Sequence, residues 1–147
     1  MTDRLTVSER AFLAQAGESI RQLRRLGELG QSQARESEMR AHAQKIASDY
    51  RPLLERIERL ARKKGAALLP SPETPSESYQ ELAAKSGPEF ERAFAGILYE
   101  LHERALTLFE QAAGDARDPD VRQFAASQLP MLREHRNRMT VLRKPFD

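Results

Sequence analysis

The sequence predicts an all-α protein built as one four-helix bundle. Apolar residues recur at steps of three and four through most of the 147 residues, as on one face of a helix. Most of the prolines and capping motifs fall between these periodic stretches. The hydrophobic fraction of 39% is enough to fill one core, so we expect a single domain over residues 1–147.

The first helix is expected over residues 7–33. Thr6 and Glu9 have the spacing of a capping box, in which each side chain accepts a backbone N–H from the other residue. The apolar stripe that follows includes Gly27 and Gly30, which lower helix propensity but allow a neighbouring helix to approach closely. The stripe consists of Leu13, Ala16, Ile20, Leu23, Gly27 and Gly30.

The second helix is expected over residues 37–64. Ser37 is the predicted N-cap, and Gly65 is free to turn left-handed at the end of the helix. Pro52 removes one backbone hydrogen bond, but the apolar stripe keeps its phase across this residue. We therefore expect a kink rather than a break.

A long proline-rich connection over residues 66–75 separates the second helix from a short one at about 75–85. Pro70, Pro72 and Pro75 are spaced too closely for any helix interior. A connection of this length can run along the bundle, as in the crossover of ferritin-like folds, or form an irregular loop at one end of the bundle. We favour the crossover.

Two further long helices are expected over residues 88–113 and 119–143. Ser86 and Glu89 form a second potential capping box, and Gly114 is the predicted stop of the third long helix. Asp118 before Pro119 is a strong start signal for the fourth.

The composition excludes several kinds of protein. The absence of cysteine excludes disulfides, thiolate metal sites and a cysteine nucleophile, and a net charge of +2 argues against a polybasic nucleic-acid arm. Phosphate-binding glycine motifs and the G-x-S-x-G motif are absent, so we expect no enzymatic activity. No stretch is apolar enough to span a membrane, and no signal peptide is recognisable. The expected location is the periplasm or envelope if a leader was trimmed, and otherwise the cytoplasm.

A di-iron or di-manganese site needs Glu-x-x-His motifs, and the sequence has none. A site for a single divalent metal is conceivable, with His102, His135 and Asp49 as ligands. We favour the alternative that both histidines lie inside the bundle and bond to carboxylates or to each other. Asp49 is then paired with a donor such as Tyr50, His102 or an arginine. His42 is expected at the edge of its stripe with its polar tip in water.

Basic residues cluster at Arg21, Arg24 and Arg25 and again near the end of the chain. A patch for anionic membranes or nucleic acid is one interpretation. Solvated helix faces are the simpler one, because glutamates are interspersed among the central helices. The C-terminal group consists of Arg133, Arg136, Arg138, Arg143 and Lys144.

The order of motifs resembles a bacterial family of unknown function, whose members are small ferritin-like helical bundles, usually secreted and often labelled outer-membrane or periplasmic proteins. The resemblance covers roughly residues 8–143, and its most specific part is the Leu-Pro-x-Leu-x-x-His stretch that ends at His135. It implies a bacterial origin and an envelope location, but no reaction. The other matching stretches are residues 12–13, 39–43, 48–50, 60–65, 86–90, 102–110 and 129–134.

The chain departs from that family pattern at four positions. Members commonly carry His where Tyr50 stands, Glu where Leu23 aligns, Phe where His42 stands and Asp where Glu91 stands. The polar cluster between the helices is thereby thinned to Asp49, His102 and His135.

Three functions stay open from the sequence. The leading one is a non-enzymatic bundle without a cofactor that acts by binding a protein, a second copy of itself or a small ligand. The alternatives are a metal-binding or redox bundle with a degenerate ferritin-type site, and a binder of anionic surfaces.

Overall fold

The computed structural model describes residues 4–68, 70 and 74–146. Within these ranges the chain is helical, and no residue is assigned to a strand. The long helices are α1 (Val7–Gln33), α2 (Ser37–Lys63), α4 (Gly87–Asp115) and α5 (Pro119–Arg143). A short helix, α3 (Glu77–Ala83), precedes α4, and a 3-10 turn, η1 (Lys144–Phe146), follows α5. The prediction of an all-α bundle is confirmed.

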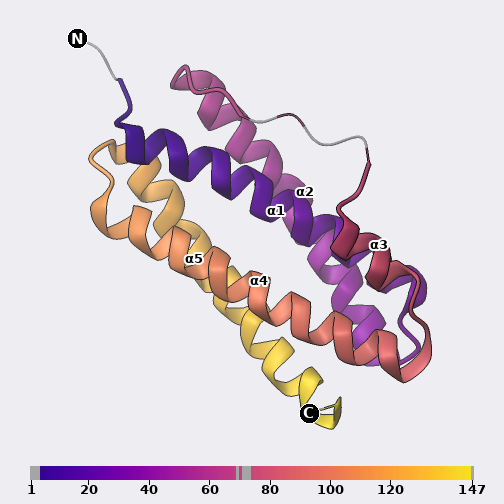
Figure 1. Cartoon of the computed structure of the whole chain (residues 1–147). Helices are drawn as coiled ribbons and strands as arrows, with labels where there is room; N and C mark the ends of the chain where they lie inside the picture. Colours follow the sequence, from indigo (N-terminus) through magenta and orange to yellow (C-terminus); the bar gives the residue numbers. More distant parts are fainter. Residues whose placement is uncertain (1–3, 69, 71–73, 147) are drawn as a thin grey trace.

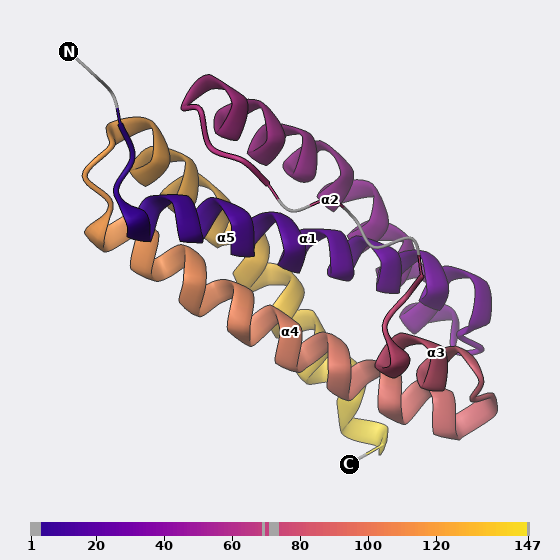
Figure 2. The same cartoon turned by 45° about the horizontal axis from the view of Figure 1, so that its top comes forward.

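The four long helices form two antiparallel hairpins that lie side by side (Figures 1 and 2). Helix α1 packs along α2, and α4 packs along α5. The hairpins meet mainly through α1 and α4, whereas the contact between α2 and α5 is slighter. The bundle therefore has one close seam between its hairpins and one looser seam.

The connection between the hairpins spans the length of the bundle. The end of α2 and the short helix α3 lie at opposite ends of the molecule (Figure 1). Leu68 of this connection packs against the core. The arrangement is the predicted crossover, which makes α2 and α4 run in the same direction. Pro72 and part of the proline-rich stretch lie outside the described residues.

Some of the predicted helix caps are present in the structure and others are not. Thr6 and Glu9 form the predicted capping box, and Gly65 has the expected positive φ of +70°. Ser86 occupies the N-cap position of α4, but its side chain makes no hydrogen bond to the helix, so the predicted capping box with Glu89 does not form. Gly87, the first residue of α4, has a φ of +62°. Glu36 rather than Ser37 is the N-cap of α2.

Helix α2 continues through Pro52 without a break. Helix α4 passes the predicted stop at Gly114 and ends at Asp115. Two interhelical turns are held from the opposite hairpin. Glu9 of α1 accepts hydrogen bonds from Arg117 N and Asp118 N between α4 and α5, at 2.7 and 2.8 Å.

Glu91 of α4 makes the reciprocal contact, accepting from the backbone N–H groups of Arg35 and Glu36 between α1 and α2. Both glutamates are buried. At the end where α2 stops and α5 starts, Lys64 Nζ lies 3.0 Å from Asp118 Oδ2 and 2.8 Å from Asp120 Oδ2. Each hairpin is therefore fastened to the other at both ends.

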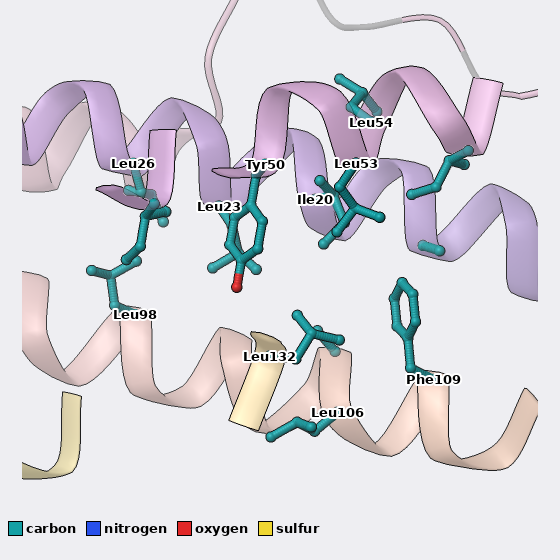
Figure 3. Packing of buried hydrophobic residues seen from close by; sticks show 14 of the residues in the cluster. Ile20, Leu23, Leu26, Tyr50, Leu53, Leu54, Leu98, Leu106, Phe109 and Leu132 are labelled. Atoms are coloured by element: carbon teal, nitrogen blue, oxygen red, sulfur yellow. The ribbon is translucent and has the colours of Figure 1, made fainter. Parts of the chain in front are cut away.

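The core runs along the whole axis between the hairpins. Figure 3 shows side chains of α1 and α2 facing those of α4 and α5, with Tyr50 directing its hydroxyl oxygen toward α4. Tyr50 is completely buried, and a buried hydroxyl needs a hydrogen-bond partner. The partner of this hydroxyl belongs to the candidate site described below. The largest fully buried side chains are Tyr50, Phe90, Phe94, Phe109, Leu13, Ile20, Leu23, Met39, Ile46, Ile57, Leu82 and Leu98.

Candidate functional site

Polar side chains from three helices meet in the middle of this core. His42, Asp49 and Tyr50 belong to α2, where a spacing of seven residues places His42 and Asp49 on the same face, two turns apart. His102 belongs to α4 and His135 to α5. We call these five residues the histidine cluster.

Tyr50 and His102 form a buried pair. The Tyr50 hydroxyl donates to His102 Nε2 at 2.7 Å, and His102 Nδ1–H donates to the Leu98 carbonyl at 2.8 Å. Both ring nitrogens of His102 therefore have partners. His102 therefore lies inside the bundle as expected, but its partners are a tyrosine hydroxyl and a backbone carbonyl rather than a carboxylate or another histidine.

His135 pairs with Asp49 across the looser seam between α2 and α5. His135 Nε2 donates to Asp49 Oδ2 at 2.9 Å, and Lys45 Nζ lies 3.8 Å from the same oxygen. The His135 side chain is 1% exposed and the Asp49 side chain 30% exposed. Asp49 thus links the buried cluster to the surface of the bundle.

His42 lies deeper than expected. The sequence places its tip in water, but the residue is only 6% exposed because α5 covers it. Its ring centroid lies 5.1 Å from that of His135, and His135 lies 5.9 Å from His102. Two buried ring nitrogens, His42 Nε2 and His135 Nδ1, have no hydrogen-bond partner in the described part of the chain.

All three imidazoles are neutral at pH 7. Burial lowers the pKa of His42 to about 3 and that of His102 to about 4. Burial also lowers the pKa of His135, although the hydrogen bond to Asp49 opposes this effect. Burial, with the nearby charge of Asp49, raises the pKa of Tyr50, so the phenol keeps its proton.

The predicted metal candidates His102, His135 and Asp49 do lie in one cluster. Asp49 bonds to His135, however, and His102 bonds to Tyr50. As the side chains stand, no three His, Cys, Asp or Glu residues of the described ranges are arranged to hold an ion. The cluster is a set of neutral hydrogen-bonded rings rather than a carboxylate-rich centre.

A groove lies on the other side of the bundle, where α3 packs beside α1 and α4. It has a volume of about 440 Å³. Leu26, Leu82, Ile97 and Leu101 contribute its apolar surface. The polar residues that line it are Glu18, Arg21, Gln22, Arg25, Ser76, Ser78, Tyr79, Glu100 and Arg104.

The charges around this groove are unevenly paired. Arg21 Nη1 lies 3.1 Å from Glu18 Oε2. Neither Arg25 nor Arg104 forms an ion pair with another residue in the described ranges. Glu100 carries the remaining negative charge, so three guanidinium groups face two carboxylates. We call this hollow, with its lining residues, the α3 groove.

The α3 groove continues along the seam between α1 and α4 into a shallower hollow of about 660 Å³. The two share Glu18, Gln22, Leu101 and Arg104. The sequence predicts a basic cluster that includes Arg21 and Arg25, but it does not predict this groove. The groove depends on where the crossover places α3, which helical periodicity does not encode.

A protein-family model for a domain of unknown function, DUF4142, matches residues 1–142. The chain belongs to the DUF4142 family. The predicted resemblance to a bacterial family of unknown function is thereby confirmed. No curated protein matches the DUF4142 chain.

The fold of this DUF4142 protein is similar to that of the crystal structure of a DUF305 fragment from Deinococcus radiodurans. The TM-score is 0.80 at 21% sequence identity, over 95% of this chain and 97% of that chain. At this identity the likeness concerns the helical fold alone.

No helix in the described ranges combines the length and the apolar composition that a membrane span requires.

Proposed function

We propose that this DUF4142 protein is a non-enzymatic binding protein whose α3 groove takes a small organic anion with an apolar body. The volume of the groove, about 440 Å³, lies in the range of small-molecule sites. Its apolar residues suit an alkyl or aryl body, and the excess of guanidinium groups suits a carboxylate. The presence of apolar side chains together with an excess of guanidinium groups in one groove is the main support for the proposal.

The lining of the groove supports binding rather than catalysis. It includes serine and tyrosine hydroxyls but no histidine or cysteine among the described residues. A hydroxyl nucleophile needs an adjacent base, and the three histidines lie inside the bundle instead. A binding role is the simpler function for this surface.

The arginines at the end of the chain give less support to a binder of extended anionic surfaces. Arg133 lies 3.2 Å from Glu110, and Arg136 lies 3.2 Å from Glu103. Arg138 lies 3.8 Å from Glu38. Because carboxylates accompany these side chains, the local field is mixed rather than uniformly positive.

The test uses decanoate as the probe, with displacement of the anionic dye 1-anilinonaphthalene-8-sulfonate as the readout. We expect saturable binding at one site. Replacing Arg25 and Arg104 together by glutamine should weaken binding at least about tenfold, equivalent to about 1.4 kcal/mol. Arg59→Gln, at an exposed position on α2, is the matched control and should bind like the unmodified protein.

Decanol separates the two parts of the proposed recognition, because it keeps the chain and lacks the charge. It should bind more weakly than decanoate and should be insensitive to the arginine substitutions. Absence of saturable decanoate binding, or equal binding by the double variant, would contradict the proposal.

A further inference from the structure

The histidine cluster contains two polar atoms whose burial the hydrogen bonds do not explain. His42 Nε2 and His135 Nδ1 are buried and lack partners in the described part of the chain. Such atoms are uncommon in folded proteins, because leaving a buried polar group without a partner is costly. The two rings come from different helices, and their centroids are 5.1 Å apart.

The His135 ring is held on the side opposite its unpartnered nitrogen, as in a metal-binding histidine. His135 donates Nε2–H to the Asp49 carboxylate, so the proton lies on Nε2 and the lone pair on Nδ1. Carboxylates and backbone carbonyls are the usual outer partners of imidazole ligands, because they fix the tautomer and the ring orientation.

We infer that His42 Nε2 and His135 Nδ1 are ligands of one zinc-like divalent ion held between α2 and α5. Zinc–nitrogen bonds are about 2.0–2.1 Å long, and two rings whose centroids are separated as these are can bind one ion of this kind. The inference concerns the bundle interior and is independent of the α3 groove. Asp49 acts as an orienting residue, not as a ligand.

His102 supplies the third ligand by exchanging its present partner. Its Nε2 accepts a hydrogen bond from Tyr50, and its ring centroid lies 5.9 Å from that of His135. In the ion-bound state Nε2 leaves the Tyr50 hydroxyl and binds the ion, while Nδ1–H keeps its bond to the Leu98 carbonyl. This exchange accounts for the absence of three convergent ligands among the described residues as they stand.

Some charges around the histidine cluster favour a bound cation and others oppose it. Asp49, with a side chain 30% exposed, supplies negative charge and a route from solvent. Lys45 beside Asp49 and Arg138 near His42 oppose a cation. Binding therefore depends on direct nitrogen coordination rather than on a general negative potential.

The experiment is a titration of untagged protein with zinc, followed by calorimetry, and with cobalt(II) as the spectroscopic probe. We expect one ion per chain and a cobalt spectrum typical of nitrogen ligands in tetrahedral geometry. His42→Gln and His135→Gln should each weaken zinc binding at least about tenfold. Asp115→Asn, at an exposed position, is the control and should leave zinc binding unchanged.

The variant Tyr50→Phe tests whether His102 acts as a ligand of the ion or only as a structural residue. It removes the hydroxyl that competes for His102 Nε2, so zinc should bind more tightly to this variant even though the fold is less stable. Nitrogen NMR of the unmodified protein gives a second readout: zinc should shift His42 Nε2 and His135 Nδ1. This measurement holds even if the histidine variants fail to fold.

The inference is overturned if zinc does not bind at about 1 mM, or if it binds equally to both histidine variants. It is also overturned if NMR shows the two nitrogens bonded to water while zinc leaves their signals unchanged. Decanoate binding to the α3 groove should be the same with and without zinc, so failure of either proposal is visible separately.

Discussion

At the scale of single residues, Glu9 makes hydrogen bonds both at the start of its own helix and to the opposite hairpin. Its Oε1 accepts from Thr6 N at 2.8 Å, and its Oε2 accepts from two amides of the turn between α4 and α5. The residue is 4% exposed. One carboxylate therefore caps α1 and also fastens the opposite hairpin.

Replacing Glu9 by glutamine should lower the free energy of unfolding at pH 7 by about 2–3 kcal/mol, because hydrogen bonds to a charged acceptor are lost. Urea unfolding followed by circular dichroism measures this. Glu28→Gln, at an exposed position on the same helix, is the control and should change stability by less than about 0.5 kcal/mol. Equal effects of the two substitutions would show that the buried carboxylate has no special role.

Glu9 also makes the stability of the fold depend on pH. Burial alone would raise the pKa of Glu9, but hydrogen bonds from the backbone at Asp118, Thr6 and Arg117 outweigh it and hold the pKa below the ordinary 4.5. The unfolded chain therefore binds this proton more readily. The contribution is complete above pH 4.5 and is lost as the pH falls through the lower folded value. The Glu9→Gln variant should lose less stability than the unmodified protein between about pH 5 and pH 3, where ordinary carboxyl groups take up protons.

Glu9 also shows how far sequence reasoning reaches at this scale. The capping box with Thr6 was predicted, because it depends on a spacing of three residues. The bonds to Arg117 N and Asp118 N were not, because they join distant parts of the chain. For the same reason the sequence predicts histidines bonded to carboxylates or to each other, as His135 is to Asp49, but it does not predict the Tyr50–His102 bond.

At the scale of elements, the close approach of α1 and α2 depends on small residues. A β-carbon added at Gly27 would lie 2.8 Å from Ala43 O and 2.9 Å from Ala47 N, both backbone atoms. One added at Gly17 would meet nothing nearer than Leu68, at 3.7 Å. The expectation that glycine on the stripe allows close helix packing is therefore correct at Gly27.

These two glycines form a matched pair for a stability test. Gly27→Ala should destabilise the protein by about 1–3 kcal/mol, because the backbone of α2 has to move. Gly17→Ala should be neutral or should stabilise by up to about 1 kcal/mol, since alanine favours the helix. Thermal unfolding of both variants measures the difference, and equal midpoints would contradict the packing described here.

The short helix α3 depends on a single buried side chain. Leu82 is 1% exposed, and it is the one residue of α3 classed as buried. Gln33 Nε2 adds a hydrogen bond to the Ala83 carbonyl at 3.2 Å. With so few contacts, α3 should open locally before the bundle unfolds.

Leu82→Ala tests this local stability. Hydrogen exchange should accelerate in residues 77–83 at least about tenfold, because the anchor of α3 is removed. Exchange in the centres of α2 and α5 should stay unchanged. Decanoate binding should weaken in parallel, since Leu82 also lines the α3 groove. Uniform acceleration across all helices would show that α3 unfolds only with the whole bundle.

At the scale of the whole molecule, two similar hairpins are joined by a crossover and fastened by reciprocal glutamates. The helices could be predicted from periodicity and caps, and the crossover from the length of the proline-rich connection. The α3 groove could not, because its walls come from three elements whose relative positions are set by packing. The deeper burial of His42 has the same origin, since it depends on how α5 covers α2.

The proposal that the α3 groove is the binding surface of this protein can be tested by a titration of ¹⁵N-labelled protein with decanoate, followed by NMR of the backbone amides. We expect saturable shifts confined to α3 and to the residues of α1 and α4 that line the groove. Shifts centred on α2 and α5, or no shifts at all, would contradict it.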